Sequence, residues 1–156
     1  MKTIPLSQGQ YAIVDDEDYE DLARHKWHAS WNPRTRSFYA QRNIRLPSGK
    51  QTQQLMHRVI LGLKRGDVRQ GDHINHATLD NRRVNLRVVT NQENQHNRRD
   101  KGYSWYKSRR KYLARIKVDG VRKYLGQYDT AAEARAAYLS AKAIYHPTAP
   151  FSVEMT

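Results

Sequence analysis

Four polar residues in the middle of the chain have the types and the order needed to cut a phosphodiester: Asp72, His73, Asn85 and Asn94. A neutral imidazole can take a proton from an attacking water when a divalent cation polarises the phosphoryl oxygen and supports the departing 3′ oxygen. A hard ion such as Mg²⁺ needs only one or two carboxylate or amide oxygens from the protein. We therefore predict His73 as the general base, Asp72 and Asn94 as ligands of Mg²⁺, and Asn85 as the group that orients the imidazole.

The patterning around these residues predicts two strands and a helix. Segments 68–74 and 85–89 have strand character, and the Asn-rich segment 75–83 between them has the composition of a loop. A Thr-x-x-Glu capping box then opens a predicted helix over 90–99, with the last of the four polar residues in its first turns. A hairpin followed by one helix would bring these side chains together although they are far apart in sequence.

Several short blocks follow one another in a characteristic order. They are Met56-His57-Arg58, Asp72-His73-Ile74-Asn75, Leu79-Asp80-Asn81-Arg82-Arg83, Asn85-Leu86-Arg87-Val88 and the asparagines after residue 90. Together they resemble the HNH homing-endonuclease family, in particular its phage and intron branch. The resemblance implies a ββα-metal, or His-Me finger, nuclease in which Asp72 and Asn94 hold the ion, His73 is the base and Asn85 is the middle residue of the motif.

The last motif position departs from the family pattern. The archetypal motif ends in a histidine where this chain has Asn94, and Asn91 and His96 are alternative ligands. Asn-rich loops also serve simply as turn formers. On that interpretation the chain would be a DNA-binding regulator or architectural protein that carries an inactive nuclease remnant.

Two further groups of ionisable residues have simpler interpretations. The acids between Asp15 and Asp21 are expected in the first turns of a helix over 15–25, where carboxylates are favoured by the helix dipole. His57 opens a predicted short helix over 57–62, and its type and position fit a structural role as well as a catalytic one.

The charge balance indicates a polyanionic partner. The 156-residue chain carries 28 Lys and Arg against 15 Asp and Glu, a formal net charge of +13. The excess is concentrated in residues 98–124, which hold eleven basic and two acidic side chains. We expect double-stranded DNA as the partner, because no RNP-like motif favours RNA and no segment is long and apolar enough to span a membrane.

The chain as a whole predicts an α+β protein with two modules. The first, residues 1–99, is a nuclease module with a β-rich N-terminal extension; the second, residues 100–146, binds DNA, and residues 147–156 form a tail. Residues 1–10 lack the apolar core of a secretory signal and there is no cysteine, which predicts the cytoplasm of a bacterial or phage-infected cell. A monomer is favoured.

Strand patterns outside the motif complete this prediction. The extension is expected to contain a strand over 11–14 and a hairpin with arms 37–46 and 51–57. In the second module we expect strands over 103–107, 111–118 and 121–128, and a helix over 130–145 opened by another capping box. Apolar residues alternate with Arg115 and Lys117 along the middle strand, so one face should pack and the other should be basic.

The second module resembles the Apetala-type, or ethylene-response-factor, DNA-binding domain over about 45 residues. The resemblance rests on Gly102-Tyr103-Ser104-Trp105, Tyr112-Leu113-Ala114-Arg115-Ile116-Lys117, the segment Lys123-Tyr124-Leu125-Gly126-Gln127-Tyr128-Asp129-Thr130 and the Ala-rich helix. Family members place the sheet in the major groove. The implied DNA contacts are Arg115, Lys117, Arg122 and Tyr124, followed by Trp105, Arg109 and Lys111. Together the two resemblances imply a site-directed DNA endonuclease of the homing type.

Overall fold

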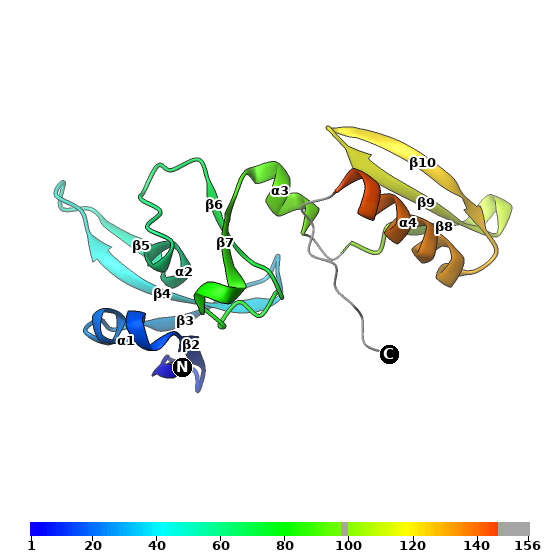
Figure 1. Ribbon diagram of the computed structural model, residues 1–156. Helices are drawn as coiled ribbons and strands as arrows, with labels where there is room; N and C mark the ends of the chain where they lie inside the picture. The colour runs from blue at the N-terminus through cyan, green and yellow to red at the C-terminus, as the bar shows by residue number, and fades with distance from the viewer. Residues whose placement is uncertain (98–99, 147–156) are drawn as a thin grey trace. The chain divides into compact units, whose positions relative to one another are not determined.

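The computed structural model describes residues 1–97 and 100–146, with only the backbone of Gln95 (Figure 1). The chain forms two compact units that meet between Asn91 and Gln92. The described residues have mixed helical and strand structure, in agreement with the predicted α+β class. The predicted tail, 147–156, lies outside the described residues.

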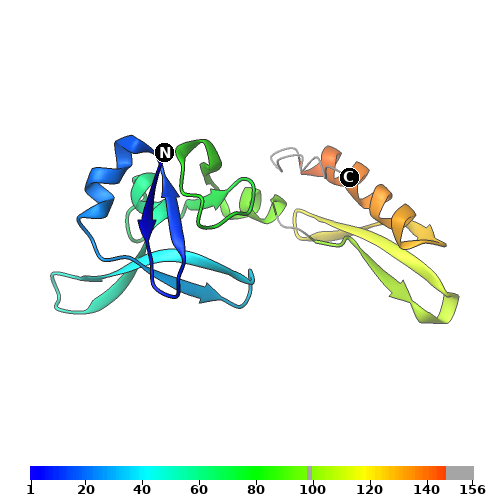
Figure 2. The ribbon, with the colours of Figure 1, turned by 90° about the horizontal axis from the view of Figure 1, so that it is seen from below.

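The N-terminal unit contains seven strands, two α-helices and a 3₁₀ turn. They are β1 (Lys2–Pro5), β2 (Tyr11–Val14), α1 (Asp16–Ala23), β3 (His28–Asn32), β4 (Ser37–Arg45), β5 (Gln51–Leu55), α2 (Met56–Ile60), β6 (Gln70–His73), η1 (Arg83–Asn85) and β7 (Leu86–Val89). The strands form three antiparallel sheets, β1–β2, β3–β4–β5 and β6–β7. In Figure 2 the hairpin β1–β2 crosses in front of the three-stranded sheet.

The hydrophobic core of this unit joins all three sheets. Its buried members are Ile4, Ala12, Val14, Leu22, Trp27, Ala40, Met56, Ile60 and Leu86. Trp27 also donates from Nε1 to the carbonyl oxygen of Leu22 at 2.8 Å, so the one polar atom of this buried indole has a partner. The core therefore fixes hairpin β6–β7, through Leu86, against the rest of the unit.

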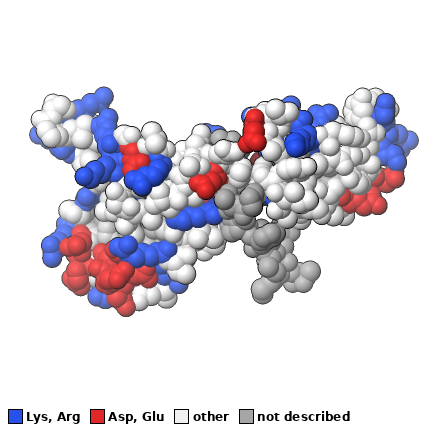
Figure 3. Space-filling model, turned by 45° about the horizontal axis from the view of Figure 1, so that its top comes forward, with Lys and Arg blue, Asp and Glu red and all other residues white. Residues whose placement is uncertain are grey.

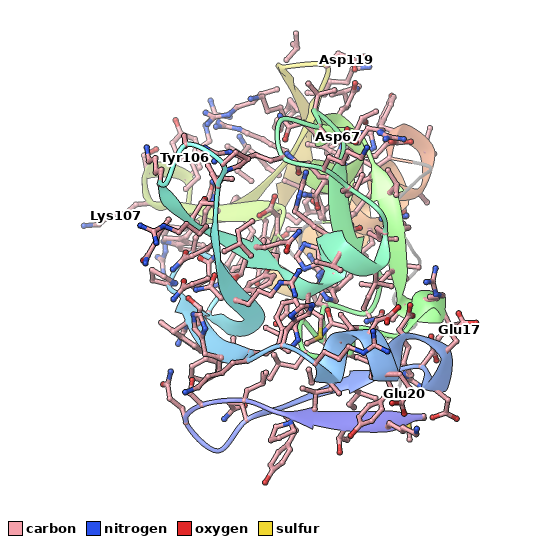
Figure 4. All side chains as sticks on the ribbon, turned by 90° about the vertical axis from the view of Figure 1, so that its left-hand side faces the viewer. Glu17, Glu20, Asp67, Tyr106, Lys107 and Asp119 are labelled. Atoms are coloured by element: carbon pink, nitrogen blue, oxygen red, sulfur yellow. The ribbon has the colours of Figure 1, made fainter. Side chains whose placement is uncertain are left out.

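The acidic residues expected in the first turn of α1 are present there as Asp16, Glu17 and Asp18, and acids at this end of the helix also make a tertiary contact. Asp15 precedes the helix but its side chain does not cap it; its Oδ2 accepts instead from the backbone N–H of Arg83 at 2.8 Å. The Arg83 guanidinium pairs with Asp18 at 2.6 Å and with Glu17 at 2.8 Å. The acids gather over α1 in Figure 3, and Glu17 and Glu20 project outward from it in Figure 4. These acids therefore lie where the helix dipole favours them and also hold η1 against α1.

The C-terminal unit is a sheet with one covering helix. Its elements are α3 (Asn91–His96), which begins at the junction, β8 (Tyr103–Tyr106), η2 (Lys107–Arg109), β9 (Lys111–Val118), β10 (Val121–Tyr128) and α4 (Ala131–Tyr145). The antiparallel strand order is β10–β9–β8, and α4 lies along one face (Figure 1). The predicted capping box is present, because Thr130 and Glu133 each bond the other's backbone N–H.

A glycine lets the start of β8 approach α4 closely. Gly102 has φ +77°, and a Cβ atom there would lie 1.9 Å from the ring of Tyr138. Tyr138 packs with Ile116 and Ala141 to form the small core beneath the sheet. Residue 102 therefore needs both the left-handed backbone and the missing side chain.

Two predicted boundaries in the nuclease motif are wrong. Strand β6 begins at Gln70 rather than residue 68, because Val68 is exposed and Asp67 closes a turn by accepting from the backbone N–H of Arg69 at 3.0 Å. Helix α3 ends at His96, before a turn at Asn97, and its Asn- and His-rich composition has low helix propensity; residues 98 and 99 of the predicted helix lie outside the described residues. None of the described helices has the length and hydropathy of a membrane span.

Candidate active site

Asp72 and His73 are consecutive residues at the end of β6, where the strand leads into the loop of hairpin β6–β7. In the antiparallel register Asp72 lies opposite Arg87 and His73 opposite Leu86. The carboxylate of Asp72 is only 8% exposed, and its Oδ2 accepts from Nε and Nη2 of Arg87 at 2.9 and 2.8 Å. The predicted metal ligand is therefore already oriented, and balanced by a positive charge, in this structure.

The imidazole of His73 is 5% exposed and lies against a buried amide. Its Nε2 is 3.4 Å from Oδ1 of Asn81, which is itself 1% exposed. An acceptor at Nε2 favours the tautomer with its proton there. Burial lowers the pKa of His73, although the bond to Asn81 and the charge of Asp72 act in the opposite direction. The imidazole is therefore neutral at pH 7, as a general base requires.

Two further rings pack against the imidazole of His73. The rings of His57 and His73 meet edge to face with centroids 4.9 Å apart, and Tyr39 lies 6.1 Å from the first and 6.0 Å from the second. We call Tyr39, His57 and His73 the three-ring cluster. Burial lowers the pKa of His57 to about 3, so this second histidine is also uncharged.

Asn85 braces the loop between the two strands of the hairpin. Its Oδ1 accepts from the backbone N–H of Asn75 at 3.0 Å, and its Nδ2 donates to the carbonyl oxygen of Asp80 at 2.8 Å. The amide that lies against His73 belongs to Asn81, four positions earlier in the chain. Asn85 is therefore not the amide within hydrogen-bonding distance of His73; it holds the loop that carries Asn81.

An ion pair stiffens the same loop. Asp80 accepts from Nε and Nη2 of Arg82, both at 2.7 Å, and this contact lowers the pKa of the Asp80 carboxyl. On either side of Asp80 the backbone pairs with Ile13 of β2: Ile13 N–H donates to Leu79 and Asn81 N–H donates to Ile13, at 2.9 and 2.8 Å. The loop is thus held as an extra strand segment, which fixes the amide of Asn81.

The second predicted metal ligand lies on α3. Asn94 is half-buried, and this helix is grouped with the C-terminal unit from Gln92 onward. Of the alternative ligands, Asn91 accepts from Nε2 of Gln70 at 3.3 Å, and His96 stacks on His146 with ring centroids 4.0 Å apart. Among the side chains that the structure describes, no three His, Cys, Asp or Glu groups gather as a metal cluster. A ligand pair of one carboxylate and one amide, completed by waters, does not require such a cluster.

The C-terminal sheet leaves a basic face opposite α4. Lys117 pairs with Arg122 and Arg115 pairs with Tyr124 across β9 and β10, so all four share the face that α4 does not cover. The three basic side chains are exposed, and Tyr124 is 61% exposed. Cations beside an exposed aromatic ring are the combination used to contact phosphates and bases.

Two of the predicted DNA contacts sit differently from the rest. Trp105 lies opposite Tyr112 and so shares the face of Ala114 and Ile116, away from the basic face, although it is 50% exposed. Lys111 is on the basic face but forms an ion pair with Asp129. The residue opposite Lys111 is Tyr106, an exposed aromatic that the sequence did not single out.

The turn η2, which follows β8, adds further basic side chains. Lys107 extends outward beside Tyr106 in Figure 4, and Arg109, a predicted contact, is exposed in η2. Exposed cations in a turn at the end of a basic face widen the surface that a phosphate backbone can follow.

The Asp-His pair at the end of the hairpin lies within a segment that has a recognisable family pattern. Residues 54–96 match the family model described as HNH endonuclease. This segment contains Asp72, His73, Asn85 and Asn94, and it supports a nuclease, a hydrolase that acts on DNA. No curated protein and no solved structure matches the chain. The match ends before β8, so it lends no support to the resemblance of the C-terminal module.

Proposed function

We propose that this protein is a metal-dependent DNA endonuclease of the homing type, with its hydrolytic centre on hairpin β6–β7. The observation that carries the proposal is the buried imidazole of His73, which follows Asp72 in β6 and contacts Asn81, within a segment that matches HNH endonucleases. A base with a pKa below neutrality is unprotonated at pH 7 and available to take a proton.

The side chains of the hairpin divide the work as follows. His73 accepts the proton of the attacking water, while Asn81 contacts its Nε2. Asp72 and Asn94 supply the oxygens for Mg²⁺, which when bound would neutralise charge on the phosphoryl group and on the departing 3′ oxygen. Asn85 keeps the intervening loop in shape through its two backbone bonds. The products are expected to carry 5′ phosphate and 3′ hydroxyl ends.

The ion pair between Asp72 and Arg87 bears directly on metal binding. Arg87 contacts one oxygen of the carboxylate, Oδ2, through two of its nitrogens. Carboxylate and amide oxygens are the donors that Mg²⁺ prefers, so the residues fit the ion. A guanidinium at 2.8 Å nevertheless competes for the same negative charge. Asp72 would therefore hold Mg²⁺ in competition with Arg87.

The basic face of the C-terminal sheet is the proposed DNA-binding surface. Arg115, Lys117, Arg122 and Tyr124 form its centre, as their common face supports. Arg109 and Lys111 extend it, and Tyr106 joins it in place of Trp105, whose register puts it on the other face. A separate DNA-reading sheet would give the nuclease its site preference, which is the property that homing requires.

Cleavage of DNA with and without metal tests this proposal. The purified protein is incubated with genomic or candidate DNA in Mg²⁺ or in chelator, and the cut ends are mapped. The proposal predicts discrete ends, formed only with Mg²⁺, that carry 5′ phosphate. Asp72→Asn and His73→Ala variants serve as matched controls, because each removes one chemical group and leaves the C-terminal sheet unchanged.

A DNA-binding regulator with an inactive nuclease remnant is the second candidate. Two observations favour it: Asp72 is paired with Arg87, and both Asp72 and His73 are almost fully buried. This candidate predicts metal-independent DNA binding without cleavage at any Mg²⁺ concentration. The same incubation therefore separates the two functions.

A further inference from the structure

We propose that His57 is a positioning residue for the general base, which holds the imidazole of His73 in its working orientation. The inference rests on the proposed function, because it assigns a role toward His73. It concerns a residue outside the Asp-His-Asn-Asn set, on helix α2, which comes from a different part of the chain. The carrying observation is the edge-to-face contact between the two imidazoles, with centroids 4.9 Å apart and planes at 77°.

The site of His57 is shaped to admit a flat ring. Gly71 of β6 lies so close that a Cβ atom there would be 2.6 Å from Cδ2 of His57. Leu61 bounds the same space, since its Cδ1 would lie 3.0 Å from that Cβ. With Tyr39 on another side, the His57 ring is enclosed by β4, α2 and β6, and it can shift only by displacing one of its neighbours.

His57 also meets His73 without adding charge. Burial keeps it neutral at pH 7. The adjacent cation, Arg58, is turned to other partners, because its guanidinium donates to the carbonyl oxygens of Lys64 and Arg69 at 2.9 and 3.3 Å. A neutral ring edge restrains the neighbouring imidazole by shape and by the quadrupole of the pair. A cation in this place would instead disfavour the imidazolium that forms when His73 accepts a proton.

Shape and orientation account for the expected effect on the reaction. Asn81 contacts His73 at one nitrogen, with Oδ1 and Nε2 3.4 Å apart. His57 and Tyr39 also pack against the His73 ring, with centroids 4.9 and 6.0 Å from it. Loss of this packing would displace the imidazole of His73 slightly from its reactive position. Contacts that orient a reacting group in this way typically contribute about 10- to 100-fold to activity.

Two substitutions at His57 separate positioning from simple packing. His57→Phe keeps a flat neutral ring, whereas His57→Leu keeps an apolar side chain without one. Met56→Leu, at the neighbouring fully buried core position, is the matched control for lost stability. For each variant we would record the imidazole NMR signals of His73 without metal, the single-turnover rate of DNA cleavage with Mg²⁺, and the Kd for DNA.

We expect His57→Leu to replace the single set of His73 signals by broadened or multiple ones. Its cleavage rate should fall about 10- to 100-fold at an unchanged Kd. His57→Phe and Met56→Leu should retain both the signals and the rate. A His73 spectrum unaltered in His57→Leu, or equal rate losses in the Leu and Phe variants, would overturn the inference. If the parent protein cuts no DNA, the proposed nuclease function fails, and the NMR comparison still decides whether His57 holds His73.

Discussion

The buried histidine His57 makes a quantitative prediction about acid stability. Its pKa is lowered from 6.5 to about 3, so the unfolded chain binds a proton in this range that the folded chain does not. The stabilising effect of the neutral residue is complete above pH 6.5 and is lost as the pH falls toward 3. The slope for one such group is about 1.4 kcal/mol per pH unit, which amounts to about 3 kcal/mol between pH 7 and pH 4.5. That is a large part of a typical unfolding free energy of about 5–15 kcal/mol.

Urea unfolding at a series of pH values measures this slope. Trp31→Phe and Trp105→Phe would leave the buried Trp27 as a fluorescent reporter of the N-terminal unit. In this background the unfolding free energy of the parent should fall steeply below pH 6.5. That of His57→Phe should fall less steeply, by about 1.4 kcal/mol per pH unit, which is the contribution of one histidine. The pKa of His73 is lowered as well, and this residue is present in both proteins. Equal acid sensitivity of the parent and His57→Phe would refute the reasoning.

Three further predictions concern the C-terminal unit. Gly102→Ala should destabilise this unit, by more than the roughly 1 kcal/mol that a positive φ costs, because the new methyl group overlaps the ring of Tyr138; a thermal melt followed by circular dichroism checks it. Replacing Arg115 and Lys117 together by Ala should flatten the dependence of log K on log salt by about two units for double-stranded DNA; an unchanged slope would return this face to ordinary solvated surface. Asn94→Asp should bind Mg²⁺ at least as tightly as the parent in calorimetry, since a charged oxygen replaces a neutral one; weaker binding would remove residue 94 from the ligand set.

Local patterns predicted the C-terminal unit in detail. The ranges expected for β9 and β10 agree with the structure, and α4 begins directly after the cap that its Thr-x-x-Glu box indicated. Strand β2 was also predicted with its observed bounds. In each case the information is contained in alternation, helical spacing or a cap within the element itself.

Two strands whose formation depends on pairing with a neighbouring strand were not predicted. Strand β1 was missed; it pairs with β2 through a turn at Gln8 and Gly9, both with positive φ. Strand β3 was missed as well, because its sequence mixes polar and apolar residues and its place is set by pairing with β4. Such strands exist because a neighbouring strand satisfies their backbone groups, and propensity within the segment carries little of that information.

The residues proposed for the site were chosen by type and order, and the sequence did not predict the side chains that contact them. The sequence offers many asparagines near His73, and only the fold shows that Asn81, rather than Asn85, lies against its imidazole. The pairing of Asp72 with Arg87 follows from the hairpin register, which one residue of slip would destroy. A sequence signal for it did exist: Asp72 and Arg87 occupy strands of the expected hairpin and have opposite charges.

The most direct test of the nuclease proposal is a titration of cleavage with Mg²⁺ for two neighbouring variants. Asp72→Asn weakens the proposed metal site by removing a charge, and His73→Ala removes the proposed base. Raising the Mg²⁺ concentration should partly restore cleavage by Asp72→Asn and should leave His73→Ala slower than the parent by about two to four orders of magnitude. Equal restoration of both variants, or restoration of His73→Ala alone, would contradict the assignment of ligand and base.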